Sequence, residues 1–392
     1  MHILDCYSLN CGLKIREPFI YEKFFPLNVD KYITLDTLGV FPSRRYDYWS
    51  EVVEILAPIL EKEDIKILHL AGNKEEALND THNLCGQTTL NQAAYIVRGG
   101  LLHLGVDGFT NHIASYYNKK IVSLFGESPP ENNAPVFSDK KSMSLISPNC
   151  GDKGYSYSAE EKPKNINSIK PEDIAEKVCD LLGVDFNYNF KTIKIGERFS
   201  EKSVELIPDG NPIDPNGLSV DSLIIRMDLS FNEEALVKQL QLNKCSIITD
   251  KPINVKLLKH FRYHIVQFVY LIGDKDSKQY VEDLFKAGIQ CLLMTEKNGK
   301  ELEALKFKYL DFGKIHQRGQ CSKPKELEGM DLNKIYYKSP KYLIFRGSVF
   351  FSESSCREQD PVKMVGDTKF KKIIDEDSFW KESDLFYFSE LI

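Results

Sequence analysis

The sequence has no long hydrophobic run, no closely spaced cysteine pair and no excess of basic residues. No window approaches the roughly 20 consecutive apolar residues that a membrane-spanning helix requires. The first residues, Met1–Arg16, lack the basic run followed by an apolar stretch that marks a secretory leader. These absences predict a protein of the cytoplasm without a transmembrane segment.

The nine cysteines are scattered along the 392 residues without regular spacing. An odd number of isolated cysteines disfavours both a disulfide framework and a structural zinc site, so we expect reduced thiols. Lysine and arginine number 51 against 57 aspartates and glutamates, which gives a net charge of −6. This balance disfavours broad electrostatic attachment to nucleic acid but leaves room for a local basic cleft.

The chain does contain enough apolar material for a sizeable core, with 42% hydrophobic and 11% aromatic residues. Its length predicts two domains, or one unusually large one. Short apolar runs alternate with amphipathic stretches in both halves, which is typical of βαβ units with a mostly parallel sheet. We therefore predict the α/β class, with two Rossmann-like domains that face each other across a cleft.

Turn residues interrupt this alternation near the middle of the chain, as in Pro208-Asp209-Gly210. We predict a first domain over residues 1–185, a linker over 186–219 and a second domain over 220–392. Near its end, two aromatic-rich runs on either side of Arg346-Gly347 predict a hairpin, and the last 25 residues are predicted to be partly helical. The strands predicted in the first half are Tyr32–Leu35, Ile65–Leu70, Leu101–Val106 and Ile121–Phe125, and the helices are Tyr48–Leu60, Leu90–Arg98 and Asn111–Tyr117.

The segment Leu84–Pro135 carries the most informative residues. Asp107 follows a predicted buried strand, and Gly108 begins a turn into a helix whose free N-terminal amides can hold a diphosphate. The structural alternatives are a capping role for Asp107 and a helix-face role for His112. The other residues predicted to line this phosphate site are Thr110, Asn111, His112, Gly126 and Ser128.

Two consecutive arginines, Arg44 and Arg45, stand between the first predicted strand and the following helix. A guanidinium suits bidentate contact with phosphate, so both are candidates for the same site. The alternative is a solvated basic turn.

These residues resemble the nucleotide-binding half of the family-nine glycosyltransferases, the ADP-heptose:lipopolysaccharide heptosyltransferase group. That family has a Gly-x-Thr-Ser-Leu turn, an Asp-(Ser/Thr)-Gly-x-x-His-x-Ala-Ala loop and a strand that ends in Phe-Gly-x-Thr. Gly108-Phe109 departs from the family, because the turn glycine is shifted by one position. The matching residues are Gly86, Thr88, Thr89, Leu90, Asp107, His112, Ala114, Phe125, Gly126 and Ser128.

The resemblance implies a GT-B protein in which residues 1–185 bind the donor and residues 220–392 bind the acceptor. In the family the acceptor half comes first, so this chain would be circularly permuted. The strand that begins at Leu223 resembles the opening of the acceptor half, but the family's acidic residue falls on Asn232, which cannot act as a base. The neighbouring carboxylates Asp228 and Glu233, and also Glu234, could deprotonate the acceptor hydroxyl or serve as helix N-terminal charges.

The sequence therefore predicts an inverting glycosyltransferase that moves a sugar from a nucleotide-diphospho-sugar to a hydroxyl. The acceptor would be a surface glycan, a lipopolysaccharide core or a modified nucleobase. No Asp-x-Asp pair stands at a strand end in the first half, so we predict neither a metal site nor any cofactor besides the donor substrate. The alternatives are a nucleotide-sugar epimerase on the same fold and an inactive protein that binds sugar nucleotides or glycans.

Overall fold

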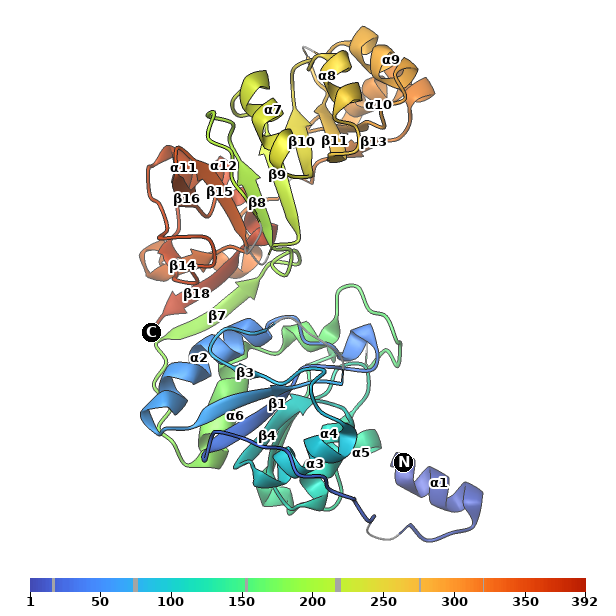
Figure 1. The fold of residues 1–392 in the computed structure, drawn as a ribbon, viewed down its shortest axis with the longest axis vertical. Helices are drawn as coiled ribbons and strands as arrows, with labels where there is room; N and C mark the ends of the chain where they lie inside the picture. Colours follow the sequence, from blue (N-terminus) through green and yellow to red (C-terminus); the bar gives the residue numbers. More distant parts are fainter. Residues whose placement is uncertain (16–17, 73–76, 152–153, 216–219, 275, 320) are drawn as a thin grey trace. The chain divides into compact units, whose positions relative to one another are not determined.

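The chain folds into two compact units, Met1–Asn189 and Phe190–Ile392. The computed structural model describes all residues except 16–17, 73–76, 152–153, 216–219, 275 and 320 (Figure 1). No helix in the described ranges combines the length and the apolar character needed to cross a membrane. All nine cysteines are free thiols.

The first unit is built on a six-stranded parallel sheet with the order β3-β2-β1-β4-β5-β6. This doubly wound order places β1 and β4 side by side at the centre. The strands are β1 (Tyr32–Asp36), β2 (Lys66–Leu70), β3 (His82–Asn83), β4 (Leu102–Val106), β5 (Lys120–Leu124) and β6 (Met143–Ile146), and the helices are α1 (Ile3–Cys11), α2 (Trp49–Lys62), α3 (Leu90–Gly99), α4 (Phe109–Tyr116), α5 (Pro130–Asn133) and α6 (Pro171–Leu182).

Helices cover both faces of this sheet. The α2 helix packs against α6, and α3 packs against α4 on the opposite face (Figure 1). The amphipathic pattern of α2 explains its placement, because Val52, Leu56 and Leu60 lie on one helical face and are buried. All seven strands and helices predicted in the first half are present, each within two residues of its predicted bounds.

Local signals fix where several helices begin and end. Thr89 and Gln92 form a reciprocal capping box at the start of α3. Pro171 opens α6, and Gly183 ends it in the left-handed conformation at φ 76°.

The second unit contains an eight-stranded sheet with the order β13-β12-β11-β10-β9-β8-β15-β16. All neighbouring strands are parallel except β15 and β16, which form the predicted hairpin around Arg346 and Gly347. The strands are β8 (Ser203–Leu206), β9 (Ser222–Arg226), β10 (Cys245–Thr249), β11 (Ile265–Leu271), β12 (Leu292–Thr295), β13 (Ile315–Gln317), β15 (Lys341–Phe345) and β16 (Ser348–Phe350), and the helices are α7 (Glu233–Leu242), α8 (Val255–His260), α9 (Lys278–Lys286), α10 (Gly299–Lys308), α11 (Glu353–Arg357) and α12 (Asp377–Trp380).

This second sheet has the predicted α/β alternation but not the doubly wound strand order of the first unit. From β8 to β13 each strand lies beside its predecessor, so the order does not reverse within this run. Hydrophobic periodicity predicts single elements, whereas strand order depends on the face on which each connecting helix packs. The alternation alone could not distinguish the two arrangements.

A smaller antiparallel sheet completes the second unit, with the order β17-β14-β18-β7. Its bounds are β7 (Phe190–Ile195), β14 (Ile335–Lys338), β17 (Lys371–Lys372) and β18 (Tyr387–Leu391). Tyr337 on β14 packs edge-on against Phe379, with ring centroids 4.7 Å apart, and contacts Phe386 at 4.8 Å. These rings join the small sheet to the core of the unit.

One prediction for this region needs correction. The predicted linker over 186–219, of which residues 216–219 lie outside the described part, contains β7 and β8. The last 25 residues are partly helical, as predicted, since they contain the short helix α12, but they also contain β17 and β18, which were not predicted. In both places short strands are held by pairing with distant segments, and such pairing leaves little local periodicity in the sequence.

Candidate functional site

The predicted donor-site residues lie at the carboxyl edge of the sheet in the first unit. The central strands β1 and β4 end there at Asp36 and Val106, and the helices that follow them, α2 and α4, pack on opposite faces. This is a topological switch point, where open α/β sheets bind their ligands. The hydroxyl of Thr110 donates to Asp36 Oδ2 at 2.7 Å and joins the two sides of the switch point.

Asp107 directly follows β4 and is 5% exposed. Its Oδ2 lies 3.0 Å from Arg44 Nη1 and accepts a hydrogen bond from Asn133 Nδ2 at 3.2 Å. Burial raises the pKa of the Asp107 carboxyl, and the nearby charge of Arg44 partly offsets this increase. Asp107 is thus a buried carboxylate paired with the predicted phosphate-binding arginine.

A second carboxylate, Glu127, holds the same arginine and was missed in the sequence analysis. Arg44 Nε donates to Glu127 Oε1 at 2.6 Å. Glu127 is 5% exposed, and its Oε2 atom is buried without a hydrogen-bond partner among the described residues. A charged residue directly after the strand-ending Phe-Gly was the available signal, but the family pattern leaves that position open.

A close approach of two main-chain segments brings Arg44 to this edge. A Cβ atom on Gly126 would lie 2.7 Å from the carbonyl oxygen of Ser43, so a glycine is required at this position. Ser128, two residues after Gly126, is buried, and its hydroxyl lies 3.4 Å from Glu127 Oε1. Gly126 and Ser128 therefore border the Arg44 cluster, which we define as Arg44, Asp107 and Glu127, and Gly126 acts through its lack of a side chain.

The N-terminus of α4 lies at the same edge and has no side-chain cap. Gly108 is its N-cap residue, in an extended conformation, and offers no side chain to the first-turn amides. The N–H groups of these amides can donate hydrogen bonds to a bound anion. Asn111 has a different role, because its amide nitrogen donates to Val106 O at 2.6 Å and to Ser123 Oγ at 2.7 Å. Its side chain fixes α4 to the sheet.

The remaining predicted contacts lie farther out. Arg45 is exposed and donates to Gly39 O at 3.1 Å, and no contact between Arg45 and the Arg44 cluster occurs among the described residues. His112 is half-buried, and burial together with the charge of His2 lowers the pKa of its imidazole. Thr88 is half-buried in the turn before α3.

The two candidate bases lie in the second unit with separate partners. Both oxygens of Asp228 accept hydrogen bonds from Arg226, at 2.9 and 2.7 Å. Glu233 lies in the first turn of α7, where its Oε1 accepts from the backbone N–H of Asn254 at 2.9 Å. Asn232 caps α7 through a hydrogen bond from the N–H of Ala235.

Arg226 is also the centre of a buried charge network. It is 2% exposed and contacts Glu205 Oε2 at 2.5 Å and Glu353 Oε1 at 2.7 Å, in addition to Asp228. Lys341, also 2% exposed, lies 3.0 Å from the same Glu205 oxygen. The network joins β8, β9, β15 and α11 within the unit.

This network predicts acid sensitivity of the second unit. Burial alone raises the pKa of the Glu205 carboxyl, but the charges of Lys341 and Arg226 outweigh it and lower this pKa from 4.5 to about 2. A lowered carboxyl pKa stabilises the fold above the unfolded value, and the stabilisation is lost as the pH falls from there towards 2. We expect a loss of about 3 kcal/mol in the free energy of unfolding across this range.

Urea unfolding at several pH values, followed by the fluorescence of Trp380, measures this loss. A Trp49→Phe background removes the other of the two tryptophans, which lies in the first unit. Introducing Glu205→Gln into that background should remove about 3 kcal/mol of the pH dependence. An unchanged pH dependence in the Glu205→Gln protein would contradict the assignment.

The comparison with known families decides which proteins this site resembles. Residues 41–162 match glycosyltransferase family 9, the heptosyltransferases. The resemblance inferred from the motifs is thus confirmed for this family-9 segment. It contains every predicted donor-site residue, from Arg44 to Ser128, whereas Asp228 and Glu233 lie outside it.

Solved structures similar to the chain include three glycosyltransferases. They are Escherichia coli ADP-heptose lipopolysaccharide heptosyltransferase II (20% identity, TM-score 0.31), a family 9 glycosyltransferase from Veillonella parvula (16%, 0.32) and the iron-containing dodecameric glycosyltransferase TibC from enterotoxigenic E. coli (12%, 0.34). The matches cover 45%, 39% and 43% of this chain and 50%, 46% and 52% of those chains, so the chain spans about half of their length. No curated protein matched.

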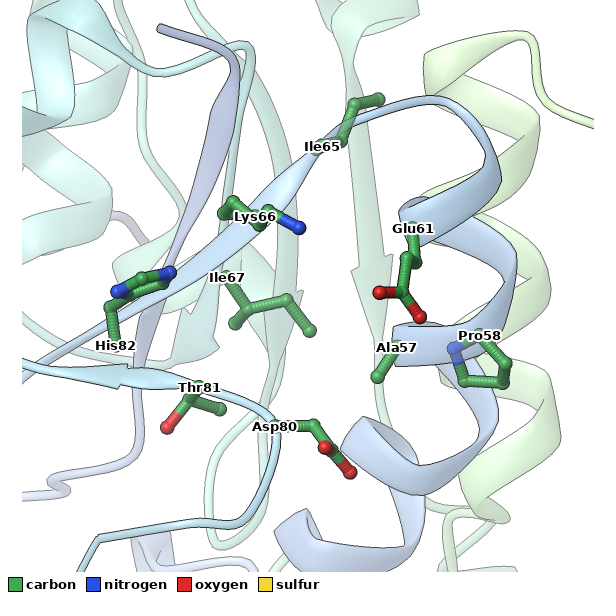
Figure 2. Close-up of a pocket in the computed structure, with 9 residues that line it drawn as sticks. All are labelled: Ala57, Pro58, Glu61, Ile65, Lys66, Ile67, Asp80, Thr81 and His82. Atoms are coloured by element: carbon green, nitrogen blue, oxygen red, sulfur yellow. The ribbon is translucent and has the colours of Figure 1, made fainter. Parts of the chain in front are cut away.

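A separate cavity lies away from this edge. It has a volume of about 370 Å³ and is lined by residues of α2, the first half of β2 and the segment that enters β3 (Figure 2). Figure 2 shows Glu61 on α2 and Asp80 before β3 at its border. None of the predicted site residues lines it.

Proposed function

We propose that the first unit binds a nucleotide-diphospho-sugar and that the protein is an inverting glycosyltransferase. The observation that carries this proposal is the coincidence of the family-9 segment with the switch point. Residues 41–162 match the family, and within them Arg44, Asp107 and the N-terminus of α4 meet at the carboxyl edge of the sheet. Such an edge is where open α/β folds hold nucleotides.

The charges at this edge suggest how the donor would be held. A diphosphate would take hydrogen bonds from the first-turn amides of α4, where the helix dipole favours negative charge. Arg44 uses Nε for Glu127 and Nη1 for Asp107, but a guanidinium has five N–H donors. It can therefore contact phosphate while it remains anchored, and it would stabilise the leaving nucleoside diphosphate as the glycosidic bond breaks.

The acceptor hydroxyl needs a base, and we propose that the second unit supplies it. Of the two candidates, Glu233 is favoured, because both oxygens of Asp228 are held by Arg226. The base would remove the hydroxyl proton as the acceptor oxygen attacks the anomeric carbon from the face opposite the leaving group. We also propose that the transfer needs no metal ion and that it takes place in a reducing, cytoplasmic setting. Activity that survives EDTA treatment would support transfer without a metal ion.

Donor binding is the direct test. A panel of UDP-, ADP-, GDP-, CMP- and dTDP-sugars is screened for stabilisation of the purified protein, since a ligand at 100 times its Kd should add about 2.7 kcal/mol. The Asp107→Asn variant should lose part of this stabilisation, because Arg44 is then held by Glu127 alone and is less well positioned. Asp173→Asn, at an exposed site on α6, is the matched control and should respond like the wild type.

The result decides between the candidate functions. If none of the sugar nucleotides stabilises the wild-type protein, the donor-site proposal fails. With a donor identified, product that forms only when an acceptor is added supports transfer, whereas product without an acceptor indicates an epimerase.

A binding protein without turnover is the second candidate. It is favoured by one observation: Arg226 holds both oxygens of Asp228, and the neighbouring Asn232 serves as a helix cap. Donor binding without consumption of the donor, across a panel of hydroxyl acceptors, would favour this candidate.

A further inference from the structure

The second unit contains a segment whose charge is opposite to that of the whole chain. Residues 235–273 hold five lysines and one arginine but a single acidic residue, Asp250, whereas the entire protein has a net charge of −6. The segment runs from α7 through β10 and α8 to the end of β11 and into the residues that follow it. The segment therefore has a net charge of +5, which is not apparent from the net charge of the whole protein.

The basic side chains of this segment face solvent. Lys244, Lys256, Lys259 and Arg262 are all exposed, and none of them forms an ion pair within the described part of the chain. Asp250 follows β10 at its carboxyl end, whereas Lys244 precedes the same strand. The acidic residue is thus separated from Lys244 by the length of the strand.

Main-chain pairing brings these residues to one edge of the sheet. The N–H of Cys245 donates to His264 O at 2.9 Å, so Lys244 lies beside the residues that enter β11. The α8 helix ends at His260, whose ring contacts Phe261 at 4.8 Å, and Phe261 in turn contacts His264 at 6.1 Å. The amino ends of β10 and β11 and the end of α8 therefore form one continuous surface.

Exposed apolar side chains share this surface with the cations. Leu242 is 57% exposed, Tyr263 is 72% exposed and Val266 is 70% exposed. The guanidinium of Arg262 stacks over the Tyr263 ring with 4.4 Å between them. We define the basic face as the six residues Leu242, Lys244, Lys259, Arg262, Tyr263 and Val266.

We propose that the basic face binds the surface of an anionic lipid bilayer. Lysine and arginine near such a surface each contribute about 1 kcal/mol of electrostatic attraction. Tyrosine is favoured at the boundary between headgroups and hydrocarbon, and aliphatic side chains gain by leaving water there. The aliphatic Leu242 and Val266 favour a lipid surface over nucleic acid, because the phosphates of nucleic acid would attract only the cations.

This proposal does not depend on the donor site, since its residues lie outside the family-9 segment. A bilayer-bound enzyme would meet lipid-linked acceptors by diffusion in two dimensions. The inference therefore adds a place of action to the proposed reaction without requiring that reaction to occur.

The test is sedimentation of the full-length protein with vesicles. Vesicles of phosphatidylcholine with 30% phosphatidylglycerol should bind the protein, pure phosphatidylcholine vesicles should not, and 0.5 M NaCl should weaken binding because it screens the charges. The triple variant Lys244→Gln, Lys259→Gln, Arg262→Gln should partition roughly 100-fold more weakly. The variant Tyr263→Ser, Val266→Ser keeps the charges and should retain weaker binding that is more sensitive to salt.

A matched control replaces three exposed lysines at the opposite, carboxyl edge of the same sheet, Lys251, Lys278 and Lys300, by glutamine. It removes the same charge and should leave vesicle binding within about threefold of the wild type, since these positions would lie away from the bilayer. Equal binding to neutral and anionic vesicles, or equal losses in the two triple variants, would overturn the proposal. So would tight binding of duplex DNA or RNA without vesicle binding, which would assign the face to nucleic acid.

Discussion

Replacing Arg44 by alanine should weaken binding of a nucleoside diphosphate roughly 100-fold, about 3 kcal/mol. Arg44 is the arginine at the switch point, where Glu127 and Asp107 hold it from two sides. Its removal takes away the positive charge and leaves two buried carboxylates that repel a phosphate. Isothermal titration with the diphosphate of the preferred donor measures the loss.

The adjacent arginine provides the matched control. Arg45→Ala removes the same charge one residue away, but Arg45 is exposed and its Nε contacts only the carbonyl of Gly39 among the described residues. We expect a change of threefold or less in Kd, as for a solvent-screened charge. Equal losses in the two variants would show that general charge, rather than the anchored guanidinium, binds the donor.

Loss of fold must be separated from loss of binding in the Arg44→Ala protein. The double variant Arg44→Ala, Glu127→Gln removes one of the two unpaired carboxylate charges, so it should regain part of the thermal stability without regaining affinity. Recovery of affinity in the double variant would show that repulsion by Glu127, rather than the missing guanidinium, caused the defect.

Replacing Arg226 by leucine should destabilise the second unit by about 3 to 5 kcal/mol. One nearly inaccessible guanidinium forms ion pairs with Glu205, Asp228 and Glu353, which come from three separate segments. Without it these carboxylates remain in a partly or fully buried environment with Lys341 as their remaining buried cation in the described network. Urea unfolding followed by Trp380 fluorescence in the Trp49→Phe background measures the change.

A control at an exposed arginine tests whether burial is the cause. Arg198 pairs with Glu201 on the surface of the same unit, with a side chain 58% exposed, and Arg198→Leu should cost less than about 1 kcal/mol. Combining Arg226→Leu with Glu205→Gln should cost less than the sum of the two single changes, because one unpaired charge is removed. Strict additivity would contradict the network.

The sequence was most informative where a local pattern determines the structure. The apolar run at residues 102–106, the turn glycine Gly108 and the following helix could be predicted because strand, turn and helix each have their own signal. The same signals located Asp107 at a strand end. They also located Arg44 between a strand and a helix, although its two carboxylate partners lie 63 and 83 residues away in the chain.

Pairing between distant residues explains what could not be predicted. Glu127 was missed because nothing near it in the sequence indicates that Arg44 lies 2.6 Å away. Asp228 was a candidate base because it is a carboxylate near Asn232, where the family's acidic residue falls, yet Arg226, two residues earlier, holds both of its oxygens. The strand β8 was included in a linker because its buried Glu205 interrupts an apolar pattern, and this glutamate is tolerated only because two cations reach it.

The close approach of Gly126 to Ser43 also bears on how such a site could diversify. The position of Arg44 depends on contact between two main-chain segments, so the frame of the site is independent of most side chains around it. Position 127 is the next residue along the chain, and it lies outside the family's fixed motif. A substitution there could exchange one ligand preference for another without disturbing the backbone, whereas a substitution at Gly126 would disturb the backbone first. Gly126, which maintains the backbone, and Glu127, at which the chemistry of the site can vary, are therefore adjacent in the chain.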